Sequence, residues 1–288
     1  MRKWLAALAL PAISLAGCAP QQHSAVPKPY GPPLRFAVVS DEPASTAPSK
    51  YAPLAGFLAK ECGWASGSVE VSARYSKVLS DIAKGDVDVA YVSPLAYVLD
   101  SKLVPLGMPF VDNTRLYEGG IFVRADSGVK SIKDLRGRKF AFQRPGSIDG
   151  YVYPAGMLKK AGIKVQPVNI GNASAVTTVF KKRADAGCAN VESIESTLVA
   201  FDKIKQIKVL MRTDPIPNGV IVARGDLPPS TLAQLTKAIA DMNVDTDGQL
   251  AMKELEFDRM APATDHDFDS LRKMTRLLRM STKALDAR

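Results

Sequence analysis

The sequence predicts an α/β protein with two domains, each built from alternating strands and helices. Apolar, β-branched segments at residues 34–40 and 87–93 have the composition of buried strands, and each precedes a segment with apolar residues at helical spacing. This alternation is typical of parallel sheets made of βαβ units. The chain has 288 residues, of which 46% are hydrophobic, and it exceeds the usual size of a single core, so two domains are expected.

The first half of the chain contains three expected strand–helix pairs. The segments are strand 34–40 with helix 50–61, strand 68–75 with helix 78–84, and strand 87–93 with a helix from Pro94 through Tyr97. Ligands of parallel sheets bind at the carboxyl ends of the strands, where Ser40, Tyr75 and Ser93 fall. Tyr75 is either a ligand contact or an aromatic residue packed on the core, and Ser93 is a ligand contact, a helix cap or both.

The second half is expected to leave the first domain and return to it. A strand over residues 117–124 crosses into the second domain, and a strand over residues 216–224 leads back. Between them the sequence predicts helices at 131–135, 173–182 and 192–201, and strands at 138–143, 165–170, 184–190 and 206–212. Apolar residues at helical spacing after Pro229 and around Met274 indicate a helical tail. The first domain therefore comprises residues 34–124 and 219–288, and the second comprises residues 125–218.

The turn over residues 143–151 is the main candidate for a binding element. A strand runs into Pro145 and Gly146, and a helix follows, so the first N–H groups of that helix have no partner within it. Such amides, together with the helix dipole, bind oxyanions. Ser147 adds a hydroxyl group that contacts a ligand or caps the helix, and Gly146 and Gly150 let a ligand approach the backbone closely.

The N-terminus has the pattern of an export signal that ends in a lipidated cysteine. Two basic residues precede a short apolar segment, and the tetrapeptide Leu15–Cys18 closes it in the pattern of a bacterial lipobox. Cleavage removes residues 1–17, and proline-rich residues 18–33 form a tether. The protein is therefore expected in the periplasm, lipid-anchored at Cys18 to the inner or the outer bacterial membrane. Lipoproteins that are retained in the inner membrane tend to carry aspartate directly after the lipidated cysteine. This sequence has Ala19 at that position, which favours the outer membrane.

Charge and composition exclude several function classes. The net charge is +9, or about +7 without the signal, but the basic residues are scattered and aromatic residues make up 7%, so no nucleic acid is expected as a partner. Cys62 and Cys188 either pair in an oxidising compartment or, for Cys188, fill a buried strand. His23 and His266 offer no zinc-type spacing and no nucleophile–base pair, so neither a metal, a cofactor nor an enzyme is expected. A monomer is expected.

Four separated segments resemble one family of transport proteins. They are residues 85–97, 131–142, 145–154 and 215–229, and in this order they are similar to periplasmic substrate-binding proteins of phosphonate, phosphite and phosphate ABC transporters. The resemblance covers residue 34 to about residue 280. It implies a two-lobed periplasmic-binding-protein clamshell, type II-like, whose lobes are joined near residues 123–128 and 215–220 and whose cleft closes on a small-molecule ligand. It also implies an ABC permease as a partner.

The resemblance carries the family's ligand contacts onto this sequence by position. The family's cleft tyrosines fall on Tyr75 and Val92, and its phosphoryl-binding Ser-Thr-Ser loop falls on Ser147, Ile148 and Asp149. Its histidine falls on Asn172, its glutamate on Glu192, and the aspartate after its Ile-Pro-Asn segment on Gly219. With Ser93 at its strand end, the expected ligand-binding residues are Tyr75, Ser93, Ser147, Ile148, Asp149, Asn172 and Glu192.

Three of these positions depart from the family pattern and bear on the ligand. Ile148 has no side-chain donor, and Asp149 repels an anion unless it turns away from the cleft to cap the helix. Asn172 is a ligand donor or a helix cap. Asp149 and Glu192 alternatively face an amine on the ligand.

These patterns predict a solute-binding lipoprotein that captures a phosphonate or related oxyanion, with or without an amine, for an ABC importer. The alternative is a ligand-sensing or accessory lipoprotein that uses the same clamshell without a transporter.

Overall fold

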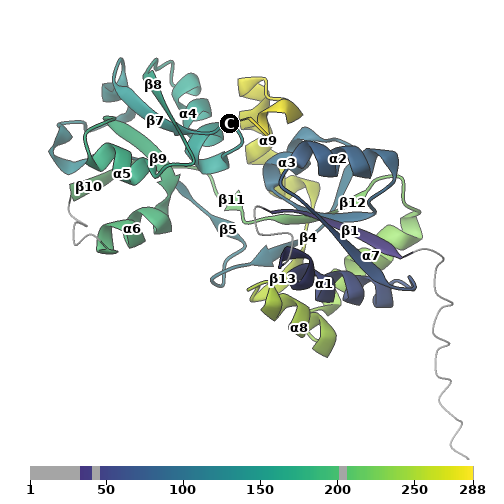
Figure 1. Ribbon diagram of the computed structural model, residues 1–288. Coiled ribbons are helices and arrows are strands. Elements are labelled where there is room, and N and C mark those ends of the chain that lie inside the picture. Colours follow the sequence, from purple (N-terminus) through teal and green to yellow (C-terminus); the bar gives the residue numbers. More distant parts are fainter. Residues whose placement is uncertain (1–32, 41–45, 201–205, 288) are drawn as a thin grey trace, which may run out of the picture.

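Two separate sheets organise the chain into two α/β lobes (Figure 1). The computed structural model describes residues 33–40, 46–200 and 206–287. The predicted signal peptide, the lipidation site Cys18 and the tether up to residue 32 lie outside the described residues. Among the residues described, no helix is both long enough and apolar enough to span a bilayer.

Lobe 1 is built on a six-stranded sheet in the order β13-β4-β12-β3-β1-β2. Its strands are β1 (Leu34–Val39), β2 (Gly67–Ser72), β3 (Val89–Val92), β4 (Leu103–Phe110), β12 (Val220–Arg224) and β13 (Arg259–Pro262). β1 pairs in parallel with β2 and β3, as the βαβ pattern predicts. β12, β4 and β13 complete the sheet in antiparallel register.

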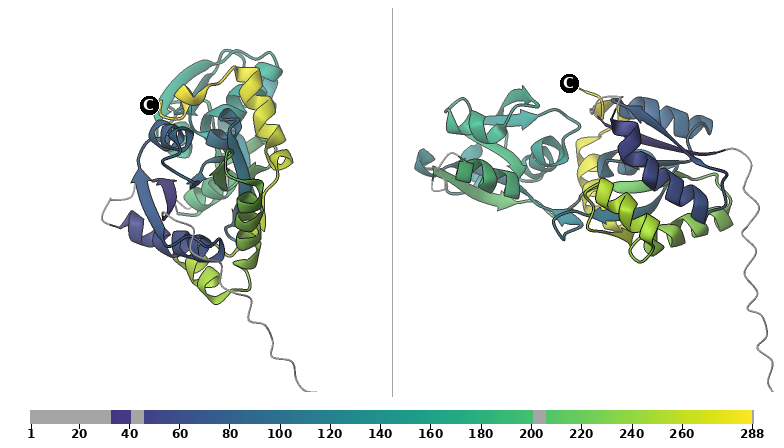
Figure 2. Two further views of the ribbon diagram at one scale, coloured as in Figure 1. Left: turned by 90° about the vertical axis from the view of Figure 1, so that its right-hand side faces the viewer. Right: turned by 60° about the horizontal axis from the view of Figure 1, so that its bottom comes forward.

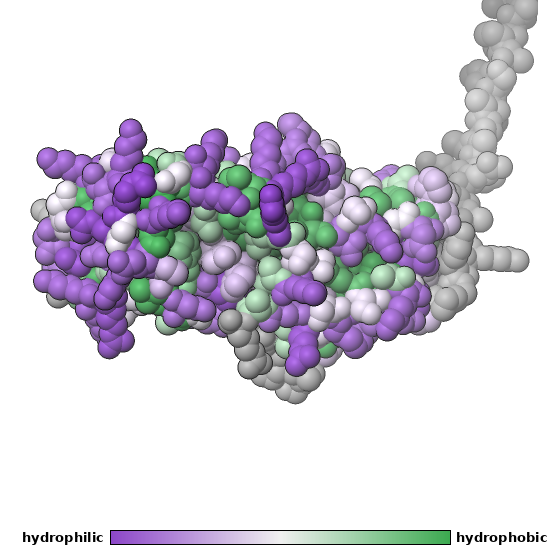
Figure 3. All heavy atoms as spheres, turned by 90° about the horizontal axis from the view of Figure 1, so that it is seen from above, coloured by the Kyte–Doolittle hydropathy of each residue, from purple (hydrophilic) through white to green (hydrophobic). Residues whose placement is uncertain are grey.

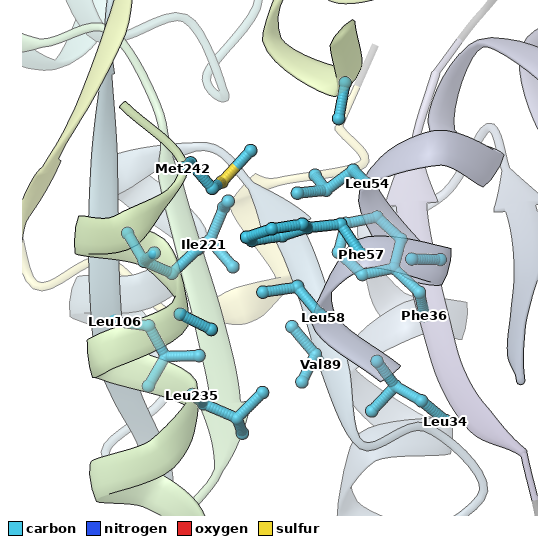
Figure 4. Close-up of a cluster of buried hydrophobic side chains, with 14 of the residues drawn as sticks. Leu34, Phe36, Leu54, Phe57, Leu58, Val89, Leu106, Ile221, Leu235 and Met242 are labelled. Carbon is cyan, nitrogen blue, oxygen red and sulfur yellow. The ribbon is translucent and has the colours of Figure 1, made fainter. Parts of the chain in front are cut away.

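Helices cover both faces of this sheet because successive side chains of each strand point to opposite faces. Phe36 and Val38 of β1 pack in the core with α1 (Ala47–Glu61), α7 (Pro229–Asp241) and α8 (Thr246–Glu254), as Figure 4 shows for Phe36. Ala37, between them, faces α2 (Tyr75–Lys84) and α3 (Pro94–Leu99). The sheet is therefore buried on both sides, and this packing holds the ends of its strands in place.

Lobe 2 is built on a five-stranded sheet in the order β10-β6-β9-β7-β8. Its strands are β6 (Gly119–Arg124), β7 (Lys139–Gln143), β8 (Gln166–Gly171), β9 (Ala186–Asn190) and β10 (Ile207–Arg212). Its helices are 3₁₀ segments at Ala125–Ser127 and Ile132–Leu135, a π-helical turn η3 (Ile148–Val152), α4 (Tyr153–Lys160), α5 (Ala175–Phe180) and α6 (Val191–Ala200). Phe140 faces the side covered by α4, and the neighbouring Ala141 faces the side covered by α5.

The lobes are joined by two short strands and by the C-terminal segment. β5 (Leu116–Tyr117) pairs antiparallel with β11 (Ile216–Pro217) between the sheets. α9 (Asp269–Leu278), preceded by a 3₁₀ turn at Asp265–Phe268, contacts α3 of lobe 1 and α4 of lobe 2, and Figures 1 and 2 show it in yellow at the junction. Lys159 of α4 donates to the carbonyl of Leu277 at 2.8 Å. A further 3₁₀ turn, η6 (Thr282–Ala284), leads to the C-terminus.

The structure corrects several boundaries that the sequence predicts. The predicted crossover strand at 117–124 divides in two, because Gly119–Arg124 pairs with β9 and β10 in lobe 2 and only Leu116–Tyr117 joins the lobes. The first domain therefore does not extend to residue 124. The predicted strand 68–75 ends at Ser72, so Tyr75 begins α2 instead of ending β2. Both sheets are mixed, since β12 of lobe 1 and β6 of lobe 2 run antiparallel to their neighbours.

The C-terminal region also differs from the sequence-based domain assignment. Residues 219–288 are predicted to belong to lobe 1, and α7 and α8 do pack there. Leu271 of α9 and Leu285 belong to a buried cluster that joins lobe 1 residues such as Leu95 to Ile148 and Tyr153 of lobe 2. The sequence does not reveal this because an amphipathic helix buries its apolar stripe equally well against either lobe.

Hydrophilic side chains dominate the lobe 2 end of the surface seen from above, at the left of Figure 3. The basic residues are spread over many elements of this lobe, among them Lys139 of β7 and Lys160 of α4. This distribution is that of a solvated surface.

A buried carboxylate ties the strands of lobe 1 together at the edge where β1 and β3 begin. Asp88 accepts hydrogen bonds from the backbone and guanidinium of Arg35, at 2.8–3.0 Å, and from Arg224 of β12 at 3.1 Å. Burial alone would raise the pKa of Asp88, but the hydrogen bonds and charges of the two arginines outweigh it and lower that pKa. The group is therefore ionised in the folded protein at neutral pH.

We expect Asp88→Ala to lower the free energy of unfolding by roughly 2 kcal/mol at pH 7, because two partly buried guanidinium groups lose their partner. Since the native pKa lies below the unfolded value of about 3.9, this contribution is present above pH ~4 and is lost as pH falls through the native pKa. Urea denaturation at pH 7 and pH 3 measures the difference. Asp226→Ala, which removes an exposed partner of the same Arg224, is the control and should change stability by less than about 1 kcal/mol. A difference between wild type and Asp88→Ala that is equal at both pH values would contradict this assignment.

Candidate functional site

A pocket of about 910 Å³ lies between the two lobes. Lobe 1 contributes the residues that lead into α2, and lobe 2 contributes the residues at the ends of β7 and β8. Its lining consists of Ala73, Arg74, Tyr75, Ser76, Arg144, Gly171, Asn172 and Asp286. The structure thus brings together two predicted site residues, Tyr75 and Asn172, that lie almost a hundred positions apart in the sequence.

Local backbone geometry places the lobe 2 side of the pocket. β7 and β8 are parallel, with Gln143 opposite Gly171, so Arg144 and Asn172 follow adjacent strand ends. The N–H of Arg144 donates to the carbonyl of Gly171 at 3.2 Å. Gly171 has a φ of 58°, a conformation that glycine adopts without strain, and this turns the chain at Asn172 into the pocket. Both polar residues therefore occupy the carboxyl edge of the sheet, where α/β proteins bind ligands.

The lobe 1 side of the pocket is the N-terminus of α2. The N–H groups of Tyr75 and Ser76 point away from the helix, and both are taken by Asp286, whose carboxylate oxygens accept from them at 2.8 and 3.0 Å. Burial would raise the pKa of Asp286, but these hydrogen bonds and the charge of Arg74 prevail and lower it. An ionised carboxylate thus sits at the positive end of a helix, beside an arginine.

Three residues of this pocket, Arg74, Arg144 and Asp286, are not among those that the sequence predicts. Arg144 directly follows the predicted strand 138–143, so the rule that selected Ser40 and Ser93 at strand ends could have selected it. Arg74 precedes the helix rather than following a strand. Asp286 has no local signal, because its partners are more than 200 residues away in the sequence.

Two of the predicted site residues, Ser93 and Ser147, act as helix caps. Ser93 accepts from the N–H of Ala96 at 3.2 Å and begins α3. Ser147 accepts from the N–H of Gly150 at 3.0 Å and donates to Gln143 at 2.8 Å, with Asp149 also within reach at 3.2 Å. Asn172 is not the cap of α5, since Ser174 fills that role. The amide of Asn172 is therefore left for the pocket it lines.

The remaining predicted site residues lie outside this pocket. Ile148 is 7% exposed and packs in the cluster that joins α9 to lobe 2. Asp149 lies against Gly119. Burial is the main cause of the raised pKa of Tyr117, and the negative charge of Asp149 is the second cause. Glu192 is exposed in the first turn of α6, where its N–H donates to Asn190. In this arrangement of the lobes, the three side chains do not converge with Tyr75 and Asn172.

The two glycines expected to admit a ligand face the protein itself. A Cβ atom at Gly146 would lie 2.8 Å from the carbonyl oxygen of Leu285, and one at Gly150 would lie 2.2 Å from the side-chain oxygen of Gln143. The close approach that the sequence predicts at this turn therefore exists, but the approaching groups are the C-terminal segment and a neighbouring side chain.

Another cavity, of about 490 Å³, lies between α3 and α9 and includes several arginines. Arg272, one of them, is paired with Asp265 and Asp269, and Tyr97 donates to Asp265 at 2.5 Å. No lining residue of this cavity comes from residues 118–218, so closure of the lobes would not enclose it. The interlobe pocket is the better candidate site.

The two body cysteines do not pair. Cys62 and Cys188 are both free and buried, and they lie in different lobes. Burial, with Glu61 nearby, raises the pKa of Cys62 to about 12, and burial also raises that of Cys188. Neither thiol is a thiolate at neutral pH. Within the described part of the chain, no cluster of three or more His, Cys, Asp or Glu residues could hold a metal ion.

A family model described as "ABC transporter, phosphonate, periplasmic substrate-binding protein" matches residues 36–268. Among characterised proteins, the phosphate-import protein PhnD of Mycolicibacterium smegmatis is 28% identical over 269 residues, which cover 83% of this chain and 84% of that protein.

Solved structures show the same fold. XAC2383 from Xanthomonas citri, in a structure with bound chloride, superposes with a TM-score of 0.72 at 21% identity, covering 85% of this chain and 97% of that one. PhnD1 from Prochlorococcus marinus, in complex with methylphosphonate, superposes with a TM-score of 0.60 at 17% identity, covering 85% and 98%.

Gly219, the position of the expected family aspartate, has no room for a side chain. A Cβ atom there would lie 2.2 Å from the hydroxyl oxygen of Tyr91. The ring of Tyr91 is held between Tyr51 and Phe257, with centroid distances of 6.4 and 5.6 Å. The tyrosine therefore fills the space that a longer residue would need.

We expect Gly219→Asp to lower the free energy of unfolding by about 1–3 kcal/mol, because Tyr91 must leave its packed position. Gly56→Asp is the matched control, since a Cβ atom at Gly56 meets nothing within 4 Å and that position is exposed on α1. Chemical denaturation of the two variants measures the difference. Equal stability of the two variants would show that Tyr91 yields without cost.

Proposed function

The chain belongs to the family of periplasmic substrate-binding proteins of phosphonate ABC transporters, and on that premise we propose that its interlobe pocket captures a ligand with a phosphoryl oxyanion for an importer. Members of this family bind and deliver substrates and are not enzymes. In the proposed complex, residues of both lobes contact the ligand, so binding favours a closed arrangement.

The observation that carries this proposal is the pair of arginines on opposite sides of one pocket. Arg74 belongs to lobe 1 and Arg144 to lobe 2, and both line the same space with the N-terminus of α2. Guanidinium groups bind phosphoryl oxygens in bidentate geometry, and backbone N–H groups at a helix N-terminus favour the same anions. Tyr75 and Asn172 add a hydroxyl and an amide donor.

The names of related proteins support a phosphoryl group as the shared feature. One relative is named for phosphate import, PhnD1 was solved with methylphosphonate, and XAC2383 was also solved with ATP, at a TM-score of 0.71. These ligands differ in size but all present tetrahedral phosphorus oxygens. For this chain, we therefore propose a phosphoryl oxyanion as the recognised group. Binding experiments with different compounds identify the rest of the ligand.

An amine on the ligand is the second feature that we propose to test. Asp149 and Glu192 are negatively charged and lie outside the interlobe pocket as it stands. Lobe closure that brought them to the ligand would favour a compound with both an oxyanion and an amine. Ser93, Ser147 and Ile148 remain predicted ligand contacts of that closed state.

We expect Arg144→Gln to weaken the binding of inorganic phosphate and of methylphosphonate by about tenfold or more, because one charge-assisted contact is lost. Isothermal titration of 2-aminoethylphosphonate in parallel tests the amine, and Glu192→Gln should weaken only this compound. Arg276→Gln is the control, since it removes the same charge from α9 outside the pocket. Equal weakening by Arg276→Gln would mean that net charge, and not the pocket, binds the anion.

We further propose that Cys18 is lipidated and that the protein works from a membrane-anchored tether. The supporting observation is the Leu15–Cys18 tetrapeptide at the end of a short apolar segment. Ala19 favours the outer membrane, which would separate the protein from an inner-membrane permease. This separation is what favours the second candidate function, a ligand-sensing or accessory lipoprotein.

Mass spectrometry of the membrane-extracted protein should show acyl chains on Cys18 and no residues 1–17, and Cys18→Ser should abolish the modification. Fractionation of inner and outer membranes then separates the two functions. Recovery with the inner membrane supports the importer, and recovery with the outer membrane supports the accessory role. An unmodified Cys18 would contradict the anchor.

A further inference from the structure

The C-terminal segment runs between the lobes at the predicted oxyanion turn. After α9 comes the 3₁₀ turn η6 (Thr282–Ala284), and the N–H of Leu285 donates to the carbonyl of Thr282 at 3.1 Å. Leu285 is 2% exposed and packs in the cluster shared by both lobes. Its carbonyl oxygen faces Gly146 of lobe 2, and the next residue, Asp286, reaches α2 of lobe 1. The tail therefore lies in contact with both walls of the cleft.

Asp286 holds α2 in the way that a ligand oxyanion would. One carboxylate oxygen accepts from the N–H of Tyr75 at 2.8 Å, and the other accepts from the N–H of Ser76 at 3.0 Å. Arg74 lies close enough to contribute to the lowered pKa of this carboxylate. Two oxygens of one acid thus occupy the two amides at the positive end of the helix.

The local sequence gives this helix N-terminus no side-chain cap, whereas three other helices have one. α3, α5 and α8 are capped by the adjacent Ser93, Ser174 and Asp245. The N-cap residue of α2 is Arg74, and its side chain makes no capping hydrogen bond in the described part of the chain. The N–H groups of Tyr75 and Ser76 are instead satisfied by Asp286, which lies more than 200 residues away in the sequence.

We propose that the C-terminal tail is an internal competitor of the ligand: the carboxylate of Asp286 occupies the anion position of the interlobe pocket, and an incoming phosphoryl oxyanion displaces it. This rests on the proposed function, since it concerns the same pocket. Each backbone N–H donates one good hydrogen bond, so Asp286 and a ligand oxygen cannot both hold Tyr75 and Ser76. Repulsion between the two anions acts in the same direction.

Competition has two measurable consequences. The affinity for an anion is reduced by the fraction of time that the tail vacates its position. Ligand binding also releases residues 284–287, because Asp286 provides the polar anchor of the tail on lobe 1. A carboxylate that served only as a helix cap would show neither effect.

The first experiment compares the affinities of the wild type, Asp286→Ala and Asp286→Asn for inorganic phosphate and methylphosphonate by isothermal titration. We expect Asp286→Ala to bind about tenfold more tightly, and Asp286→Asn, which keeps one acceptor oxygen but no charge, to show a smaller gain. A truncation is unsuitable, because removal of Asp286 and the following residues would leave a new carboxylate on Leu285 beside the same turn.

Asp245→Ala is the matched control. Asp245 caps α8 through two backbone N–H groups at 2.8 and 3.0 Å, as Asp286 caps α2, but its helix lies outside the pocket. Both alanine variants therefore lose a two-amide cap, and only Asp286→Ala should gain affinity. Circular dichroism before titration verifies that each variant is folded.

The second experiment measures hydrogen exchange in residues 281–287 of the wild type. Saturating phosphate should accelerate exchange at the amides of Ala284 and Leu285, which are bonded within the tail turn. Phosphate binding with unchanged exchange there, or equal or weaker affinity in Asp286→Ala, overturns the competitor while the proposed function stands. If neither phosphate nor methylphosphonate binds any variant, the proposed function fails and the competitor fails with it.

Discussion

Three crossings between the lobes constrain everything else in this protein. The paired strands β5 and β11 connect the two sheets, with Tyr117 opposite Ile216. The third crossing is made by α9 and the tail, which pack on α3 of lobe 1 and on α4 of lobe 2. A lobe that moves must therefore bend the short ladder and slide along α9, and the interlobe pocket changes shape with that movement. The free energy of that rearrangement is therefore part of the binding free energy of any ligand that contacts both lobes.

Charge is distributed differently at the two edges of the lobe 1 sheet. At the edge where β1 and β3 begin, Asp88 is enclosed by Arg35 and Arg224, so these three charged groups are paired with one another. At the opposite edge, Arg74 faces the pocket together with Arg144 of lobe 2. Among the described residues that line the pocket, Asp286 is the acidic one, and it comes from the segment after α9 rather than from a core strand. In the proposed competition, a ligand anion replaces the carboxylate of Asp286 at this positively charged site.

The sequence predicted much of the element order because hydrophobic periodicity reports local burial. The strands 34–40, 138–143 and 165–170 and the helix 50–61 appear within a few residues of their expected positions. β4 and β13 were not predicted, since both contain proline and lack a clear alternation. Of the predicted site residues, Tyr75 and Asn172 line the interlobe pocket, whereas Glu192 and Ile148 do not in this arrangement of the lobes.

The sequence by itself determined the family, the two-lobed α/β architecture and the preference of the strand ends for polar residues. Those properties follow from local patterns: alternation, helix breakers and short motifs. Only the tertiary structure decided which polar residues meet, because Arg74 and Arg144 come together through two sheets and a hinge. It also decided that Gly146 faces the tail, and that Asp286 closes a helix more than 200 residues away. Contacts between residues so distant in the chain depend on how whole lobes pack, which no local pattern records.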